Sequence, residues 1–264
     1  MITESFDDKT AAKINPQVKE GVPSVDACIL TFSYMIEKFV LENYDCKQIG
    51  EFHFATGVTP IYQIDYNNKK FAFYKTYVGA PACVGTIEDT ISEIRTDKYI
   101  VFGGCGCLDK EIARGKVIVP TEGYRDEGIS YHYAPASDYI RITNAPIVAK
   151  FMEENGIPYV MGKTWTTDAF YRETTGNMER RKAEGCICVE MECTGVQAMC
   201  NFRNLELYTF FTSGDLLDAP EWDTRCKAGQ VKGTQHDTGH FDIAIALADY
   251  VSSESSFSKS EGEI

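Results

Sequence analysis

The chain has 264 residues, 44% of them hydrophobic and 25% charged, which is the composition of an ordinary globular protein large enough for one sizeable domain. Its net charge of −13 disfavours nucleic acid and anionic membranes as partners, because both are themselves negatively charged. No uncharged apolar run approaches the ~20 residues that span a bilayer, and no segment resembles a targeting signal, so we expect a cytoplasmic protein.

In chain order, we expect a polar N-terminal arm over residues 1–20, one catalytic domain over 21–252 and a flexible tail rich in Ser and Glu over 253–264. Within the domain, short β-prone runs alternate with longer helical patterns. The expected strands cover residues 27–32, 61–66, 71–77, 99–102, 116–120, 159–164, 186–189 and 207–212. The expected helices cover residues 34–43, 82–95, 145–155, 175–184, 194–202 and 241–252.

Alternation of strands and helices along the whole domain predicts a parallel or mixed sheet flanked by helices. Asn67 and Asn68 separate two alternating runs and predict a hairpin turn. In such sheets, ligands bind beyond the carboxyl ends of the strands. The segments expected at those ends are 79–81, 103–106, 165–170, 190–192 and 213–215.

Two carboxylates, Glu190 and Glu192, flank Met191 directly after a short apolar strand. While the chain stays extended, both point to the same side. A carboxylate at a strand end can accept the hydroxyl protons of a sugar diol. It can also stabilise the positive charge that develops on a sugar ring during glycosidic cleavage. The alternative is an exposed pair that caps the next helix.

Asp215 ends the run Thr-Ser-Gly-Asp that follows an apolar strand. An acid at this place can protonate a leaving base if burial, or the neighbouring Glu190 and Glu192, raise its pKa. The alternative is a helix N-cap for residues 216–219.

Glycines at 103, 104 and 106 follow another strand and would let the backbone approach a ligand, although a tight structural turn explains them equally well. They form neither a Walker loop nor a convincing dinucleotide-binding fingerprint. Aromatic residues around Phe170 could stack on a base, or could simply form a partly buried loop.

Ten cysteines, several of them in apolar stretches, indicate reduced, buried thiols. Zinc sites usually separate paired cysteines by two to four residues, whereas the pairs at 105/107 and 186/188 leave a gap of one. His236 and His240 have helical spacing, but Gly239 lies between them and no Glu follows the first. We therefore expect no metal.

Taken together and in order, these motifs resemble the nucleoside phosphorylase family, which includes purine nucleoside phosphorylase, uridine phosphorylase and related nucleosidases. The resemblance covers roughly residues 70 to 250. It rests on Gly-Ala-Pro at 79–81, Gly-Gly-Cys-Gly at 103–106, Gly-Lys-Val-Ile-Val-Pro at 115–120, the segment 124–133 that begins Tyr-Arg-Asp-Glu-Gly, Thr-Thr-Asp-Ala-Phe-Tyr at 166–171, Val-Glu-Met-Glu at 189–192 and Ser-Gly-Asp at 213–215.

The resemblance implies a three-layer α/β/α sandwich around a central mixed sheet, assembled as a homo-oligomer, dimer or hexamer, in which a partner subunit completes the site. Glu192 would bind the ribose hydroxyls, Met191 would pack on the sugar and Glu190 would border it. Phe170 and Ser213 would contact the base, and Asp215 would donate a proton to a purine N7. Arg125 and Asp126 would form a buried pair that shapes the pocket.

The phosphate side departs from the family pattern. Phe32 and Ile36 stand where a Gly and an Arg are expected, Val101 and Phe102 precede the glycines in place of an Arg, and Gly104 replaces a hydroxyl residue. Backbone N–H groups of Gly103, Gly104 and Gly106 could still hold phosphate, with Lys38 or Lys75 nearby; water could be the nucleophile; or the chain could bind nucleosides without turning them over.

From the resemblance we expect phosphorolysis of a purine nucleoside, or of uridine, to free base and ribose 1-phosphate. Inorganic phosphate would be the co-substrate, and no cofactor is expected. Asp215 favours a purine, whereas the segment 124–133 is closer to the uridine branch. The alternatives are a hydrolytic nucleosidase and a nucleoside-binding protein without catalysis.

Overall fold

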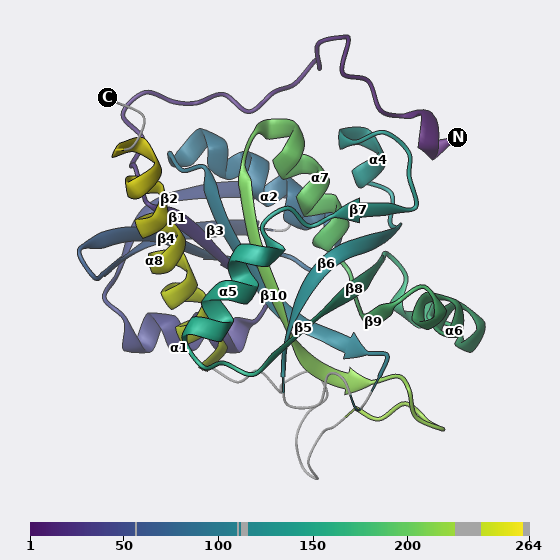
Figure 1. The fold of residues 1–264 in the computed structure, drawn as a ribbon. Helices are drawn as coiled ribbons and strands as arrows, with labels where there is room; N and C mark the ends of the chain where they lie inside the picture. The colour runs from purple at the N-terminus through teal and green to yellow at the C-terminus, as the bar shows by residue number, and fades with distance from the viewer. Residues whose placement is uncertain (56, 110, 112–115, 225–238, 261–264) are drawn as a thin grey trace.

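The computed structural model describes residues 1–55, 57–109, 111, 116–224 and 239–260 (Figure 1). One of the ten cysteines, Cys226, lies outside this part of the chain, and so does His236, considered above. So does Gly115, the first residue of one family motif.

Ten strands form one sheet. In chain order they are β1 (Ala27–Thr31), β2 (Cys46–Phe54), β3 (Gly57–Tyr66), β4 (Lys69–Lys75), β5 (Lys98–Cys107), β6 (Val117–Asp126), β7 (Tyr139–Arg141), β8 (Tyr159–Thr167), β9 (Cys186–Glu190) and β10 (Glu206–Leu216). The α-helices are α1 (Tyr34–Asn43), α2 (Ala80–Glu93), α4 (Ser130–Tyr133), α5 (Ala145–Glu154), α6 (Thr175–Ala183), α7 (Cys193–Arg203) and α8 (Gly239–Ser260), and 3-10 turns cover η1 (Ile2–Glu4) and η2 (Phe170–Arg172).

All the expected strands and helices are present, and the expected hairpin turn is confirmed. Asn67 and Asn68 adopt φ values of 50° and 62° between β3 and β4, as a tight two-residue hairpin requires. Two strands and one α-helix were not predicted, β2, β7 and α4, and neither were the 3-10 turns η1 and η2. Only Phe52 of β2 is buried, and the apolar residues of this strand are irregularly spaced, so it lacks the apolar alternation that marks a half-buried strand. Helix α8 continues through Ser260, beyond the expected end at residue 252.

The sheet is mixed, and part of it closes on itself. The strand order is β10-β6-β8-β9-β5-β1-β4-β3-β2, with β7 paired to β6 outside this path, and β10 also pairs in parallel with β5. Strands β5, β9, β8, β6 and β10 therefore form a closed ring, from which β1, β4, β3 and β2 extend as an open sheet. The closure brings the carboxyl ends of β5, β8, β9 and β10 together, and these carry most of the candidate residues.

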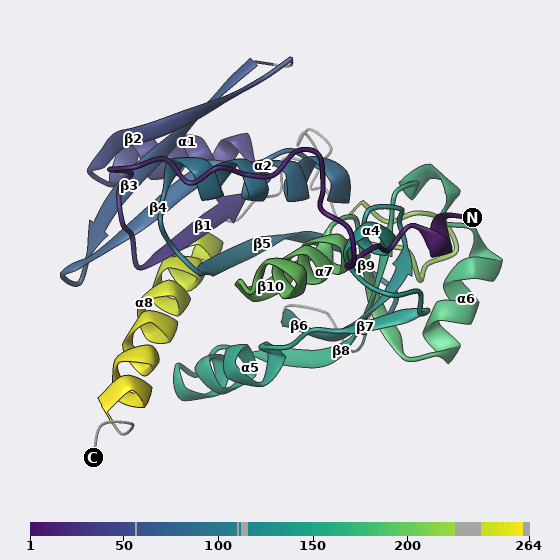
Figure 2. The ribbon, with the colours of Figure 1, turned by 90° about the horizontal axis from the view of Figure 1, so that it is seen from above.

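Helices cover both faces of the sheet. Apolar residues of α1, α5 and α8 share one core with β1, β4 and β5, including Phe73, Phe102 and Phe241. Residues of α2 and α7 form a second core on the opposite face, with Leu30 and Tyr99 from the strands. Figure 1 shows α2 and α7 close together near its top, and α5 and α8 nearer the viewer; Figure 2 shows α2 and α8 on opposite sides of β1 and β5. The expected layered α/β architecture is confirmed.

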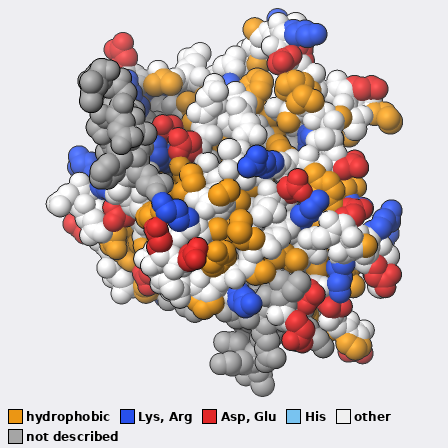
Figure 3. All heavy atoms as spheres, viewed as in Figure 1, with side chains coloured by type: hydrophobic (Ala, Val, Ile, Leu, Met, Phe, Trp, Pro, Cys, Tyr) orange, Lys and Arg blue, Asp and Glu red, His pale blue; other side chains and the backbone are white. Residues whose placement is uncertain are grey.

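On the face that Figure 3 shows, charged side chains do not gather in one place. In Figure 3, acidic and basic side chains alternate over the face that α5 and α8 present, with apolar patches between them. Among the described residues, no helix combines the length and the apolarity needed to cross a membrane.

Candidate active site

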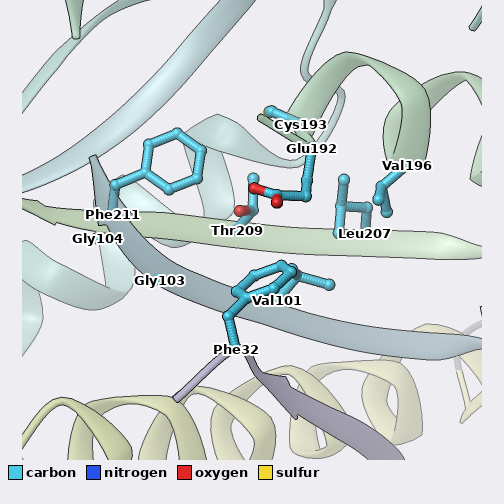
Figure 4. A pocket seen from close by; sticks show the side chains of 10 residues that line it. All are labelled: Phe32, Val101, Gly103, Gly104, Glu192, Cys193, Val196, Leu207, Thr209 and Phe211. Atoms are coloured by element: carbon cyan, nitrogen blue, oxygen red, sulfur yellow. The ribbon is translucent and has the colours of Figure 1, made fainter. Parts of the chain in front are cut away.

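A cleft of about 300 Å³, its open mouth included, lies where β1, β5 and β10 meet the start of α7. Its walls are mostly apolar, and the one carboxylate among them belongs to Glu192. Figure 4 shows this carboxylate pointing into the cleft above the ring of Phe32. The lining residues are Phe32, Val101, Gly103, Gly104, Glu192, Cys193, Val196, Leu207, Thr209 and Phe211.

Glu192 is held in place from the loop before α2. Its Oε1 accepts a hydrogen bond from the backbone N–H of Gly79 at 2.6 Å, and Gly79 has a φ of 101° that favours glycine. Burial, reinforced by the charge of Glu190, raises the pKa of Glu192 to about 8, although the Gly79 N–H opposes the rise. Glu192 thus sits in a site that disfavours its ionised form until further donors arrive. The hydroxyls of a sugar diol are donors of that kind.

Glu190 does not share this role. It is buried, and its carboxylate accepts four hydrogen bonds: from Thr164 and Thr166 Oγ1 at 3.1 and 2.5 Å, and from the backbone N–H groups of Glu192 and Cys193, both at 2.7 Å. Because β9 ends at Glu190 and α7 begins at Cys193, the two carboxylates diverge instead of pointing the same way. Glu190 caps α7 but is buried, whereas the alternative interpretation expected an exposed pair; Glu192 makes no side-chain cap bond.

The glycines at 103, 104 and 106 do not form a turn, because β5 runs straight through them. Gly103 and Gly104 line the cleft, and Gly106 is absent from the lining. A Cβ atom on Gly106 would stand 2.5 Å from Leu217 Cδ1 and 3.0 Å from Val189 Cγ1. Gly106 therefore makes room for β9 and for the end of β10.

The ring of Phe32 covers Gly103. A Cβ atom on residue 103 would lie 3.0 Å from Phe32 Cδ2, so the ring and the missing side chain fit each other. Phe32 also lines a second cleft of about 270 Å³, together with Ser33, Ile36 and His240 among others. None of the described residues that line either cleft is Lys or Arg. Lys75, considered above as a phosphate ligand, forms an ion pair with Glu37 at 2.9 Å.

Asp215 lies in a β-bulge. Strand β10 pairs with β5 in regular register up to Ser213–Cys105 and resumes at Leu216–Cys107, so Gly214 and Asp215 stand opposite the single residue Gly106. No helix follows at residues 216–219, which excludes the N-cap interpretation. Instead the chain bends back, and Leu216 and Asp223 exchange two backbone hydrogen bonds of 2.8 and 3.2 Å.

Two residues near Asp215 were missed by the sequence analysis. Trp222 donates its indole N–H to Asp215 Oδ2 at 2.5 Å. Glu173 lies close enough for the charge of Asp215 to act on it; burial first, and that charge second, raise the pKa of Glu173 to about 7. Their sequence context carries no signal, because only the tertiary structure brings them to Asp215.

The remaining candidates lie around the ends of β8, β9 and β10. Phe170 is 50% exposed and packs on the ring of Tyr171, with 4.1 Å between the centroids. Ser213 Oγ lies 2.8 Å from Cys107 Sγ. Met191 is partly exposed between Glu190 and Glu192. The residues that line the cleft do not include Phe170, Ser213 or Met191.

The expected buried pair of Arg125 and Asp126 is wrong. Successive residues of β6 point to opposite faces, so Arg125 is buried while Asp126 is exposed and accepts a hydrogen bond from Trp165 Nε1 at 2.9 Å. Arg125 instead ties α4 to the loop that follows it, donating to Ser130 Oγ in α4 at 2.8 Å and to the carbonyl of Pro135 in the loop at 2.6 Å.

The nine described cysteines carry free thiols, and only Cys46 is not buried, which confirms the expectation of buried thiols for these residues. Cys105 lies within hydrogen-bonding reach of Cys107 and Cys188. Within the described ranges, no group of three or more His, Cys, Asp or Glu side chains is arranged to hold a metal ion.

Comparisons with known proteins show the family of the chain and a similar fold. A family model described as the phosphorylase superfamily matches residues 27–231. DeoD-type purine nucleoside phosphorylases of Alkaliphilus metalliredigens and of Thermoanaerobacter sp. are 25% and 24% identical over 195 and 192 residues; each match spans 71% of this chain and, respectively, 79% and 81% of the relative. The fold is similar to that of AMP nucleosidase from Bacteroides thetaiotaomicron, with a TM-score of 0.66 at 17% identity, over 88% of this chain and 90% of that one.

Proposed function

Since the chain belongs to the phosphorylase superfamily, we propose that it cleaves the N-glycosidic bond of a purine nucleoside and that water is the nucleophile. The observation that carries the proposal is the placement of Glu192. Its carboxylate enters an apolar cleft, with one oxygen fixed by the Gly79 N–H and a pKa raised to about 8.

Glu192 would bind the ribose. Two sugar hydroxyls that donate to its oxygens would favour the ionised carboxylate, in the same way that the Gly79 N–H does. The ionised group would then lie beside the sugar as positive charge develops on the ring during C1′–N bond cleavage, and would stabilise that charge in a site with little water. Glu190 would act indirectly, by holding the start of α7 and therefore the backbone of Glu192.

The side of the cleft next to Gly103 supports water over phosphate. A phosphate dianion in an apolar cleft needs charged or multiple N–H donors, because an unpaired buried charge is costly. Phe32 covers Gly103, and the described lining residues include no Lys or Arg. Water attack at C1′ would form a C1′–O bond as the C1′–N bond breaks, giving the free base and ribose.

Phosphorolysis remains the second candidate, and a specific observation favours it: the relatives reported above are phosphorylases. In that case backbone N–H groups at Gly103 and Gly104 would have to hold the phosphate. The names of these relatives also support a purine base. Asp215 would assist by donating a proton to N7 of the leaving base. Phe170 and Ser213 would border the base.

The test is release of free base from adenosine, inosine, guanosine, uridine and AMP, each assayed with and without inorganic phosphate. We expect a purine nucleoside to be cleaved at the same rate in both conditions, with ribose as the sugar product. Product that forms only with phosphate, as ribose 1-phosphate, would establish phosphorolysis instead. A substrate that raises the melting temperature and is recovered intact would indicate binding without catalysis.

A further inference from the structure

The loop after β10 is closed by a short antiparallel bridge. Leu216 and Asp223 bond to each other in both directions, and Leu217 donates its N–H to the carbonyl of Cys107 on β5 at 2.9 Å. The intervening residues are therefore tied to the sheet at both ends. This arrangement brings Trp222, which follows Asp215 by seven residues in the chain, back into contact with Asp215.

Trp222 does not belong to the apolar core. Its side chain is 53% exposed, which is unusual for so large an apolar ring that makes only a packing contribution. Its indole N–H donates to Asp215 Oδ2. An indole has a single donor and no acceptor, so this hydrogen bond has only one possible direction.

The other carboxylate oxygen of Asp215 faces a different environment. Oδ1 lies 3.5 Å from the position that a Cβ atom on Gly106 would take. The β-bulge turns Asp215 out of the regular strand pattern, and bulges of this kind re-aim a side chain. The indole therefore binds one oxygen of Asp215, and the second oxygen lies near Gly106, where the side chains of Leu217 and Val189 take up the room that a Cβ atom would need.

We propose that Trp222 is the positioning residue for Asp215: its indole N–H binds Oδ2 and thereby fixes the orientation of the carboxylate that acts on the leaving base. The inference rests on the proposed function, in which Asp215 acts on that base. A carboxylate that rotates freely about its Cβ–Cγ bond presents the reactive oxygen correctly only part of the time. Glu173, which lies near Asp215, adds a like charge when ionised, and the indole dipole offsets part of that repulsion.

The first part of the test does not depend on activity. The chain has two Trp residues, so a ¹H–¹⁵N spectrum has two indole signals, and Trp222→Phe identifies one of them. We expect Asp215→Ala to move the Trp222 indole proton upfield, because a carboxylate acceptor is lost, and to leave the Trp165 signal in place. An unmoved Trp222 signal would overturn the inference whatever the enzyme does.

The second part is kinetic. Trp222→Phe keeps an aromatic ring and removes the donor; we expect kcat for base release to fall about tenfold with little change in KM. In the Asp215→Ala background the same substitution should have no further effect, since the residue to be positioned is gone. A rise in KM alone, or an equal effect in both backgrounds, would assign Trp222 to base stacking and overturn the positioning role. If wild-type protein cleaves no nucleoside, the proposed function fails, and the indole spectrum still decides whether Trp222 binds Asp215.

Discussion

The ring of Phe32 lies against Gly103 so closely that a Cβ atom on residue 103 would stand 3.0 Å from Phe32 Cδ2. One residue from β1's end and one from within β5 thus fill each other's space at the floor of the cleft. The pairing joins two residues that are far apart in the sequence: Gly103, which has no side chain, and Phe32, which has a large ring. It is also the relationship from which the choice of nucleophile can be tested.

Removing the Phe32 ring and adding a positive charge beside Gly103 is expected to make the reaction depend on phosphate. Ile36 lines the second cleft, so the double variant Phe32→Gly, Ile36→Arg offers both the space and a bidentate donor for phosphate. We expect ribose 1-phosphate to form in this variant when phosphate is added. Ile36→Arg alone, with the ring still present, serves as the control and should form none. Since Ile36 is buried, melting curves must first show that each variant is folded. Ribose 1-phosphate already formed by the wild type would contradict the water mechanism.

Removing the charge of Glu192 is expected to abolish most activity. Glu192→Gln keeps the shape and the bond to Gly79, but cannot accept two hydroxyl donors on a charged group or stabilise a developing cation. We expect kcat/KM for base release to fall by at least ~100-fold. The exposed Glu153→Gln on α5 is the matched control and should be indistinguishable from wild type. A Glu192→Gln rate close to wild type would remove Glu192 from the mechanism.

The pH dependence of kcat/KM follows from the same residue. In the free protein the pKa of Glu192 is about 8, so at pH 6 the carboxyl is mostly protonated and cannot accept both hydroxyls. We therefore expect kcat/KM to rise with pH and to level off above about 8. A profile measured between pH 5.5 and 9 tests this. An activity that is highest at pH 6 and falls through pH 8 would show that the protonated form is the active one.

Stability should change in the opposite sense. The pKa of Glu192 is raised from 4.5 to about 8 on folding, so between these values the folded chain holds a proton that the unfolded chain has lost. The contribution of Glu192 to the free energy of unfolding is then fully present below pH 4.5 and is lost as pH rises toward 8, by at most ~1.4 kcal/mol per pH unit. Urea unfolding of wild type and Glu192→Gln across this range measures the difference. Parallel curves for the two proteins would contradict the raised pKa.

We expect Glu190 to contribute mainly to the stability of the fold and only indirectly to the rate of base release. Glu190→Gln replaces one oxygen by an amide nitrogen, which leaves two of the four donors around it without an acceptor. We expect a loss of about 2 to 4 kcal/mol in the free energy of unfolding, measured in urea. The partly exposed Glu206→Gln at the start of β10 is the comparison. An unchanged midpoint would mean that the buried carboxylate contributes little.

Local sequence patterns were sufficient for most elements. Apolar periodicity predicted α7 and the strands on either side of it, and Asn67-Asn68 predicted the hairpin, because these signals depend on neighbouring residues alone. The pattern also placed Glu192 at a strand end, where ligands bind in such sheets. It could not separate Glu190 from Glu192, since their directions depend on where β9 stops and α7 begins.

The sequence by itself determined the alternating α/β order and the presence of carboxylates at the ends of β9 and β10. The tertiary structure decided which of them face a cleft. Two of the deciding contacts join residues far apart in the chain: the pairing of β10 with both β5 and β6, and the ring of Phe32 over Gly103. A third, between Trp222 and Asp215, depends on the loop that connects them. Such contacts depend on register and closure, which are properties of the whole sheet and leave no periodic mark on the segments that meet.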